Sequence, residues 1–340
     1  MVAATACLFL KGTLAMNNTR RVLLQGAPAL ALAGVAPGVW AQTYPARPIK
    51  IVVPSPPGGS TDLLARAVGQ RLQTAWGQPV LIENKPGAGL RLGADFVAKS
   101  APDGYTLLMA AVHHSIAQAV YAKRSYDFER DLLPISVVAV VPNVLIVPTA
   151  LPARNVAEFI ALAKAQPGKI AYGSTGLGTA HHLIGEQFND MAGVELSHIP
   201  YKGSAPALTD LMGGQIQAMF DTVASCLPHI QSGKLRALAV ATIKRSVVLP
   251  DVPTLAESGL AGFDIASWFG LMAPAGTPKN IVERVHLEVA RMLATPDMRS
   301  QLSAAGAEPV GNSPEQMAQQ IQAEVARFSA LAKKAKLSLD

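Results

Sequence analysis

The chain has 340 residues, of which 50% are hydrophobic and 15% charged, so it can bury a core large enough for two domains. Its 5% aromatic content and low charge exclude an acidic disordered chain and an aromatic-rich nucleic-acid binder. The net charge is +6, but residues 1–41 hold three basic and no acidic residues, which leaves 26 basic and 23 acidic residues. This near balance indicates neither a nucleic-acid partner nor a membrane surface.

The N-terminal segment predicts export. A pair of arginines at 20–21 precedes an apolar run that reaches Val35, and Val39-Trp40-Ala41 fits a small-x-Ala cleavage site. We therefore expect a signal peptide over residues 1–41, with Met16 as the more natural start, and a periplasmic protein once it is removed. The paired arginines are compatible with the twin-arginine route, although ordinary Sec signals carry such residues too.

From residue 48 onward, short β-branched runs alternate with amphipathic helical stretches. This alternation is typical of an α/β fold with mostly parallel sheets. The first series predicts strands at 49–54, 80–83 and 105–110 and helices at 60–76 and 90–99. The second series predicts helices at 156–165, 179–191, 204–212 and 223–232 and strands at 170–173, 196–200, 216–220 and 237–241. A strand at 268–273 and helices at 278–293 and 314–336 complete the expected elements.

Residues 132–151 form the longest apolar stretch beyond the N-terminal segment. Pro134, Pro142, Asn143 and Pro148 interrupt it, and no basic cluster flanks it, so the pattern disfavours a transmembrane helix. We expect two buried strands joined by a break at the Pro-Asn pair.

The passage from the strand at 49–54 into the helix at 60–76 is the most informative feature. Gly58 and Gly59 separate the two elements, and Ser60 opens the helix. Free N–H groups and the helix dipole at such a point bind an anion without a cationic side chain. No lysine follows the glycines, so this is not a nucleotide P-loop. The alternative is a βα turn that binds nothing.

The second series repeats this pattern. A strand runs into a loop of hydroxyl and glycine residues that opens a helix, at Ser174, Thr175, Gly176, Gly178 and Thr179. Two similar α/β domains would aim two helix N-termini at a shared cleft, where ligands of such sheets bind. The alternative is a capped helix with a flexible entry.

Three other strand ends carry polar residues. His113 and Ser115 follow the third expected strand, and they predict either a cleft wall or ordinary loop positions. Tyr201 precedes a helix start at Ser204. Asp221 ends another strand; it would either discriminate among ligands by accepting from an ammonium, a hydroxyl or water, or cap a helix.

The sequence indicates no metal, cofactor or catalytic motif. The His113-His114 and His181-His182 pairs lack any metal-ligand spacing, because adjacent histidines point in different directions. A nucleophile elbow needs glycine two residues before the serine, where Ser174 has Tyr172. Cys226 is the single cysteine beyond residue 41, so we predict no intramolecular disulfide.

Several longer motifs carry a family resemblance. They are Tyr44-Pro-Ala-Arg-Pro-Ile-Lys-Ile-Val-Val-Pro54, Gly58-Gly-Ser-Thr-Asp62, Glu83-Asn-Lys-Pro-Gly-Ala-Gly89, Pro102-Asp-Gly-Tyr-Thr-Leu-Leu108, Ile199-Pro-Tyr-Lys-Gly-Ser-Ala-Pro-Ala-Leu-Thr-Asp210 and Trp268-Phe-Gly-Leu-Met-Ala-Pro-Ala-Gly-Thr-Pro278. In these motifs, over essentially all of the chain after residue 41, the sequence resembles the Bug family, the solute-binding receptors of tripartite tricarboxylate transporters.

The resemblance implies an α/β type II periplasmic-binding-protein fold, with two α/β domains around a central ligand cleft. Domain 1 would comprise residues 42–142 and 268–340, and domain 2 residues 143–267. A small carboxylate would bind to backbone amides of the first glycine loop, and the Ser/Thr loop of domain 2 would take its distal end. These roles carry over onto Pro56, Gly58, Gly59, Ser60 and Asp62, and onto Ser174, Thr175 and Thr179. Asp221 resembles the acidic strand end of the family, and we expect Asp62 to order the helix start.

The resemblance further implies a periplasmic, non-enzymatic receptor without a cofactor. It would capture a mono- or dicarboxylate, act as a monomer and present its ligand to membrane transporter subunits; a sensor partner or an enzyme on this fold are the alternatives. Ser55 stands where the family has an aromatic or apolar residue, which would widen or polarise the pocket wall. Leu90-Arg91-Leu92 stands where Gly-Asn-Ile is frequent, so Arg91 either reaches an anionic ligand or lies on the surface.

Overall fold

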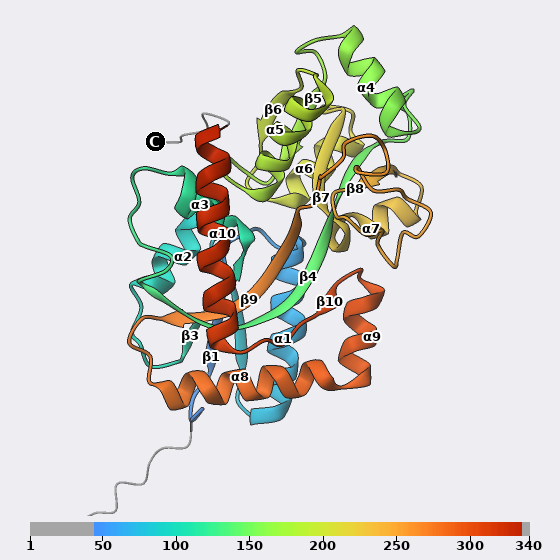
Figure 1. Cartoon of the computed structure of the whole chain (residues 1–340). Helices are drawn as coiled ribbons and strands as arrows, with labels where there is room; N and C mark the ends of the chain where they lie inside the picture. Colours follow the sequence, from blue (N-terminus) through green and yellow to red (C-terminus); the bar gives the residue numbers. More distant parts are fainter. Residues whose placement is uncertain (1–43, 335–340) are drawn as a thin grey trace, which may run out of the picture. The chain divides into compact units, whose positions relative to one another are not determined.

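A computed structural model describes residues 44–334 of the protein (Figure 1). The predicted signal peptide, with its start at Met16, lies outside the described residues, as do residues 335–336 of the last expected helix. The strands are β1 Ile49–Val53, β2 Val80–Asn84, β3 Thr106–Ala111, β4 Leu132–Pro148, β5 Ala171–Ser174, β6 Ser197–Pro200, β7 Ala218–Thr222, β8 Leu235–Val240, β9 Ala266–Pro274 and β10 Glu308–Pro309. The helices are α1 Ser60–Trp76, α2 Arg91–Ala98, α3 Val112–Val120, α4 Val156–Ala165, α5 Ala180–Ala192, α6 Ser204–Met212, α7 Val223–Gln231, α8 Lys279–Ala294, α9 Pro296–Ala304 and α10 Pro314–Lys334.

The first strand and helix show how local sequence sets these elements. Ile49, Ile51 and Val53 are completely buried in β1, which pairs in parallel with β2 and β3 on its two sides. Helix α1 has the predicted bounds and ends at Gly77, whose φ of 64° is a left-handed conformation that glycine adopts without strain.

The strands follow the order β2-β1-β3-β9-β4-β7-β5-β6, and β8 and β10 pair with β4 in addition. Pairing is parallel within β1–β3 and within β5–β7. At β4 and β9 every pairing is antiparallel in the described part of the chain. The expectation of mostly parallel sheets is therefore wrong at the centre, where two long strands run in opposite directions between the parallel groups.

Strand β4 corrects a second expectation, because residues 132–148 form one strand of 17 residues and not two. The strand is continuous, but its neighbour changes at the Pro-Asn pair. Residues of β4 up to Pro142 pair with β9, and residues from Asn143 onward pair with β7. Pro142 is the last residue in register with β9, where its missing N–H interrupts no further pairing. Figure 1 shows β4 and β9 running side by side from one group of strands to the other.

Three elements were not expected from the sequence: α3, α9 and the short β10. Helix α3 begins directly at the end of β3, without the glycine or proline that marks other boundaries. Its buried Val112, Ile116 and Val120 keep helical spacing, but a nine-residue helix offers too few turns to identify against a preceding strand.

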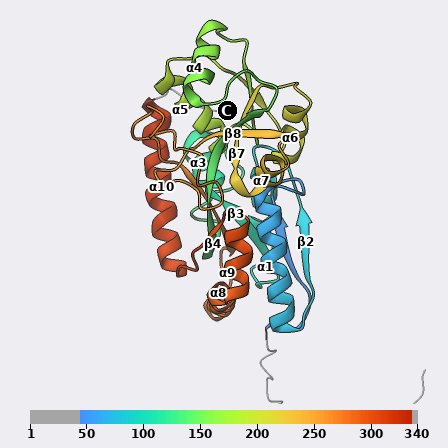
Figure 2. The ribbon, with the colours of Figure 1, turned by 90° about the vertical axis from the view of Figure 1, so that its right-hand side faces the viewer.

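Helices cover both faces of the β1–β3 side of the sheet. In Figure 2, α10 lies on one side of β3 and β4, and α1 lies on the other. One buried cluster joins residues of α1 and α8 to β1, and a second joins α2, α3 and α10 to β3. A third cluster packs α4 and α5 on β5, β7 and β8. No helix in residues 44–334 is long and apolar enough to cross a membrane.

Candidate ligand-binding site

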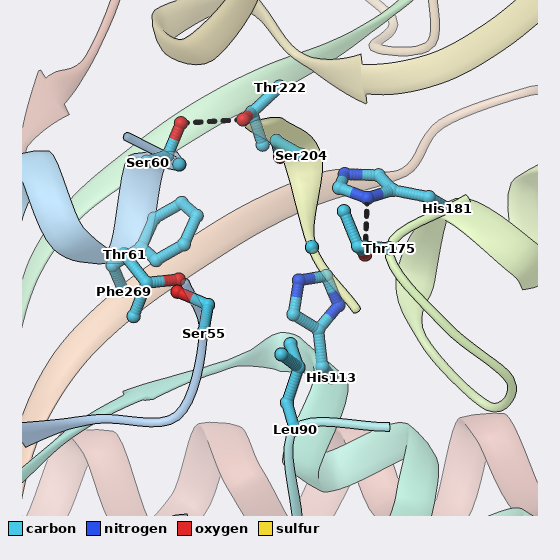
Figure 3. Close-up of a pocket in the computed structure, with 12 residues that line it drawn as sticks. Ser55, Ser60, Thr61, Leu90, His113, Thr175, His181, Ser204, Thr222 and Phe269 are labelled. Atoms are coloured by element: carbon cyan, nitrogen blue, oxygen red, sulfur yellow. Dashed lines mark hydrogen bonds between the residues drawn. The ribbon is translucent and has the colours of Figure 1, made fainter. Parts of the chain in front are cut away.

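A cavity lies at the carboxyl ends of the parallel strands, where ligands of α/β sheets bind. Its volume is about 300 Å³, including space open to solvent. Residues that follow β1, β3, β5 and β6 line it, together with Thr222 at the end of β7, Leu90 and Phe269, and Figure 3 shows this cavity. The lining residues are Ser55, Gly59, Ser60, Thr61, Leu90, His113, Thr175, His181, Gly203, Ser204, Thr222 and Phe269.

The first turns or caps of five helices contribute to this wall. Gly59 caps α1, Gly203 caps α6 and Thr222 caps α7, and the rings of His113 and His181 come from the first turns of α3 and α5. Each helix start carries partial positive charge. No lysine or arginine is among the lining residues of this cavity. The electrostatics of the described site therefore favour an anion through the main chain.

The start of α1 offers the clearest set of free donors. The N–H groups of Asp62 and Leu63 donate back to the carbonyl of Gly59, and Gly58 N–H donates to Asp62 Oδ2 at 3.0 Å. The N–H groups of Gly59, Ser60 and Thr61 donate to no main-chain or side-chain acceptor within residues 44–334. Three adjacent donors thus remain for a ligand oxygen.

Asp62 braces this loop from behind. Its carboxylate accepts from Arg66 Nε and Nη2, both at 2.9 Å, and from Asn84 Nδ2 at 3.0 Å. Burial alone would raise the pKa of Asp62, but the hydrogen bonds from Arg66, Asn84 and Gly58 outweigh it and lower this pKa. Asp62 does not line the cavity. The carboxylate thus links the loop before α1 to Arg66 and Asn84.

The start of α5 is arranged differently, because the protein uses its donors. Ala180 N–H donates to His113 Nδ1 at 2.9 Å, and His182 N–H donates to the capping Thr179 Oγ1 at 3.4 Å. Since His113 Nδ1 accepts, the proton of the neutral ring sits on Nε2. Burial, with the neighbouring His181 and His114 rings, keeps the pKa of His113 well below its usual value. His113 therefore faces the cavity as a neutral donor.

Asp221 lies behind the wall and not in it. It is completely buried, and its Oδ1 accepts from Ser204 Oγ at 2.9 Å and from Thr222 N–H at 2.8 Å. Its Oδ2 has no partner among the described residues. Burial raises the pKa of Asp221 to about 6, despite these hydrogen bonds. Asp221 thus fixes the two hydroxyl residues that do reach the cavity.

Contacts also join the two sides of the cavity directly. Ser60 Oγ lies 2.6 Å from Thr222 Oγ1, and Tyr121 donates to the carbonyl of Leu177 at 3.1 Å. Gly89 allows the close approach: a Cβ there would lie 2.5 Å from the Leu177 oxygen. In this structure the loops after the first strand group touch the loops after the second.

Five of the residues predicted from the sequence line the cavity: Ser55, Gly59, Ser60, His113 and Thr175. The Ser55 hydroxyl is buried and has no partner in the described residues, so it polarises the wall. The other predicted residues stand behind the cavity or beside it: Pro56, Gly58, Asp62, Ser115, Ser174, Gly178, Thr179, Tyr201 and Asp221.

Most of these supporting residues have identifiable contacts. Ser174 Oγ lies 2.6 Å from His198 Nε2, Gly178 N–H donates to His182 Nδ1 at 3.3 Å, and Tyr201 donates to Asp210 at 2.8 Å. Ser115 is buried on α3, and a Cβ on Gly203 would lie 2.5 Å from Pro56 Cδ. Arg91 does not reach the cavity, because its guanidinium lies over the Tyr121 ring at 3.6 Å.

Sequence reasoning missed seven lining residues: Thr61, Leu90, His181, Gly203, Ser204, Thr222 and Phe269. Gly203 and Ser204 carried a usable signal, since they form a glycine-started helix after a strand. Phe269 carried none, because it arrives from β9, more than 200 residues beyond the first loop.

A profile of the tripartite tricarboxylate transporter family receptor matches residues 64–337. The chain belongs to this family. Among solved structures, the R. palustris protein Rpa4515 with adipate is 40% identical at a TM-score of 0.85, covering 87% of this chain and 99% of that one. The periplasmic binding protein BugD is 37% identical at a TM-score of 0.84, with coverages of 87% and 99%. MatC (Rpa3494) from Rhodopseudomonas palustris with bound malate is 34% identical at a TM-score of 0.81, with coverages of 84% and 99%.

The family finding confirms three predictions from the sequence. The chain is a Bug-type receptor, it has the α/β fold of periplasmic binding proteins, and it is not an enzyme, since the family is one of receptors.

Proposed function

We propose that the protein is a periplasmic solute-binding receptor that captures a small organic anion, a mono- or dicarboxylate, for the membrane subunits of a tripartite tricarboxylate-type transporter. The observation that carries the proposal is a cavity surrounded by five helix starts and lined by no cationic side chain. A carboxylate would accept from the N–H groups of Gly59, Ser60 and Thr61, and from His113 Nε2.

Two relatives support a carboxylate as the ligand, since Rpa4515 was solved with adipate and MatC with malate. The membrane partner follows from the family name and the periplasmic location from the N-terminal segment. We expect the receptor to act as a monomer.

We also propose that the ligand stabilises a closed arrangement of two domains, residues 42–142 with 268–340 and residues 143–267. Strand β4 changes its partner at Pro142, and β9 begins at Ala266, so both strands pass between the groups near these limits. A ligand held by loops of both groups binds the closed state better, and this differential affinity shifts the equilibrium.

Thermal-shift and calorimetric titration of the exported protein with mono-, di- and tricarboxylates tests the proposal. We expect at least one carboxylate to raise the melting temperature and to bind with micromolar affinity or better, while the matching amides and amines do not. Charge-assisted contacts of about 1.5–3 kcal/mol each make such an affinity attainable. If no carboxylate binds, or a verified one binds outside this cavity, the proposed function is wrong.

A further inference from the structure

The direction of the hydrogen bonds made by Thr175, on the side of the cavity formed by residues after β5, restricts the ligand further. We propose that the ligand carries a hydroxyl group in addition to its carboxylate, and that Thr175 accepts the hydrogen bond from this hydroxyl. The inference rests on the proposed function and narrows it, from organic anions in general to hydroxycarboxylates. It follows from a series of buried hydrogen bonds that begins at Asn143 in β4 and ends at Thr175 in the cavity.

The first residue in this series of hydrogen bonds is Asn143, which is completely buried in β4. Its Nδ2 donates to the carbonyl of Ile265 at 2.8 Å, which fixes the orientation of the amide. Oδ1 must then face the other way, where it accepts from Ser267 Oγ at 2.9 Å. The main chain at Ile265 thereby makes Asn143 Oδ1 an acceptor.

The acceptor at Asn143 Oδ1 in turn determines which nitrogen of His181 carries a proton. Its Nε2 lies 3.2 Å from Asn143 Oδ1, and since that oxygen only accepts, Nε2 carries the proton. Burial lowers the pKa of His181 to about 3, so the ring is neutral and its Nδ1 has a free lone pair. Thr175 Oγ1 lies 2.8 Å from Nδ1 (Figure 3), so the threonine donates its hydroxyl proton to the ring.

Thr175 consequently has no proton left for a ligand. Thr175 is a buried residue that lines the cavity, and its hydroxyl can present only lone pairs there. Ser204 has the same polarity, because its hydroxyl donates to Asp221. A ligand hydroxyl can donate a hydrogen bond to such an oxygen. A carboxylate oxygen cannot, because it has no proton and its lone pairs would face those of the threonine oxygen.

Matched ligand pairs test the proposal on the wild-type protein by calorimetry at pH 7.5. Each pair shares a carbon skeleton and differs by one hydroxyl: succinate and malate, glutarate and 2-hydroxyglutarate, propionate and lactate, butyrate and 3-hydroxybutyrate. We expect the hydroxylated member of at least one pair to bind about five- to tenfold more tightly, the value of one neutral hydrogen bond.

Variants then assign the preference to Thr175. His181→Phe removes the acceptor of the threonine proton, so Thr175 can donate to the ligand, and the affinity ratio of the best pair should fall to about one. Thr175→Val should abolish the ratio as well, whereas the matched control Thr175→Ser should retain it. A ratio within one variant is independent of general damage to the fold; if His181→Phe does not fold, the two Thr175 variants carry the test.

The outcomes separate the two proposals. Carboxylate binding with equal affinities in every pair would overturn the hydroxyl preference and leave the receptor function in place. A preference that survives in Thr175→Val would also overturn it, because another group would then be the acceptor. Absence of any carboxylate binding would contradict the receptor function itself.

Discussion

At the start of α1, Gly59 and Asp62 have separate roles. Gly59 presents its N–H to the cavity, and the Asp62 carboxylate holds the loop from the opposite side. The glycine has an ordinary extended backbone, with φ of −85°, so a side chain at this position would act through the space that it fills and not through backbone strain. A Cβ there would lie 3.5 Å from Ser204 Oγ across the cavity.

We therefore predict that Gly59→Val reduces ligand affinity at least about tenfold, since its methyl groups extend beyond that contact and fill the anion position. The control is Gly77→Ala, where the φ of 64° is strained for alanine but nothing lies within 4 Å. That variant should lose about 1 kcal/mol of stability and keep its affinity. Calorimetry and urea unfolding measure the two quantities; an unchanged affinity for Gly59→Val would sink the anion position assigned here.

In contrast to Gly59→Val, Asp62→Ala should reduce stability more than ligand affinity. We expect a loss of about 1–3 kcal/mol in the free energy of unfolding at pH 7, with a smaller loss of affinity than for Gly59→Val. Because the folded-state pKa of Asp62 is lowered, its stabilisation is complete above the usual value of 3.8 and disappears as the pH falls through the folded-state pKa. Urea unfolding of both proteins across acidic pH should show the difference shrinking only below that value. A difference that is constant with pH would contradict the charged role of Asp62.

At the scale of elements, the sequence predicted well wherever local signals coincide. Helices α1, α4 and α6 have the expected bounds, because glycine or a polar cap stands at their starts and the apolar spacing is helical. Helix α3 lacked such a boundary, and the continuity of β4 depends on a change of partner that no local pattern encodes. Similarly, the first glycine loop was predictable as part of the site, while Phe269 and His181 reach the cavity only through the tertiary fold.

Helix α5 offers a case in which packing overrides helix propensity. Replacing a helical glycine by alanine ordinarily gains about 1 kcal/mol. At Gly185, however, a Cβ would overlap the ring of Tyr172, which the hydrogen bond to Glu186 at 2.6 Å holds in place. We predict that Gly185→Ala destabilises the protein by about 1–3 kcal/mol in urea unfolding.

The matched control for this prediction is Gly69→Ala in α1. Its nearest neighbour would be the tip of the Ile82 side chain at 3.0 Å, which can turn away. This variant should therefore stay within about 1 kcal/mol of the wild type. Equal effects of the two substitutions would contradict the rigid position assigned to Tyr172.

At the scale of the whole molecule, the Ser60–Thr222 contact at 2.6 Å is the shortest hydroxyl link between the two sides of the cavity. If closure brings these groups together, Ser60→Ala should weaken ligand binding about three- to tenfold, because one hydrogen bond of the closed state is lost. Small-angle scattering should show the radius of gyration decreasing on ligand addition, and at a fixed subsaturating ligand concentration less so in Ser60→Ala. A radius that does not respond to a bound carboxylate would exclude closure as the response to ligand.

The donors that we propose for the anion at α1 belong to the main chain, and this has an evolutionary consequence. Every residue except proline carries this N–H group, so substitutions at positions such as Ser55 or Thr175 can change which ligand binds best while the main-chain donors remain. A scaffold of this kind can diversify its cargo one side chain at a time while remaining a working receptor at every step.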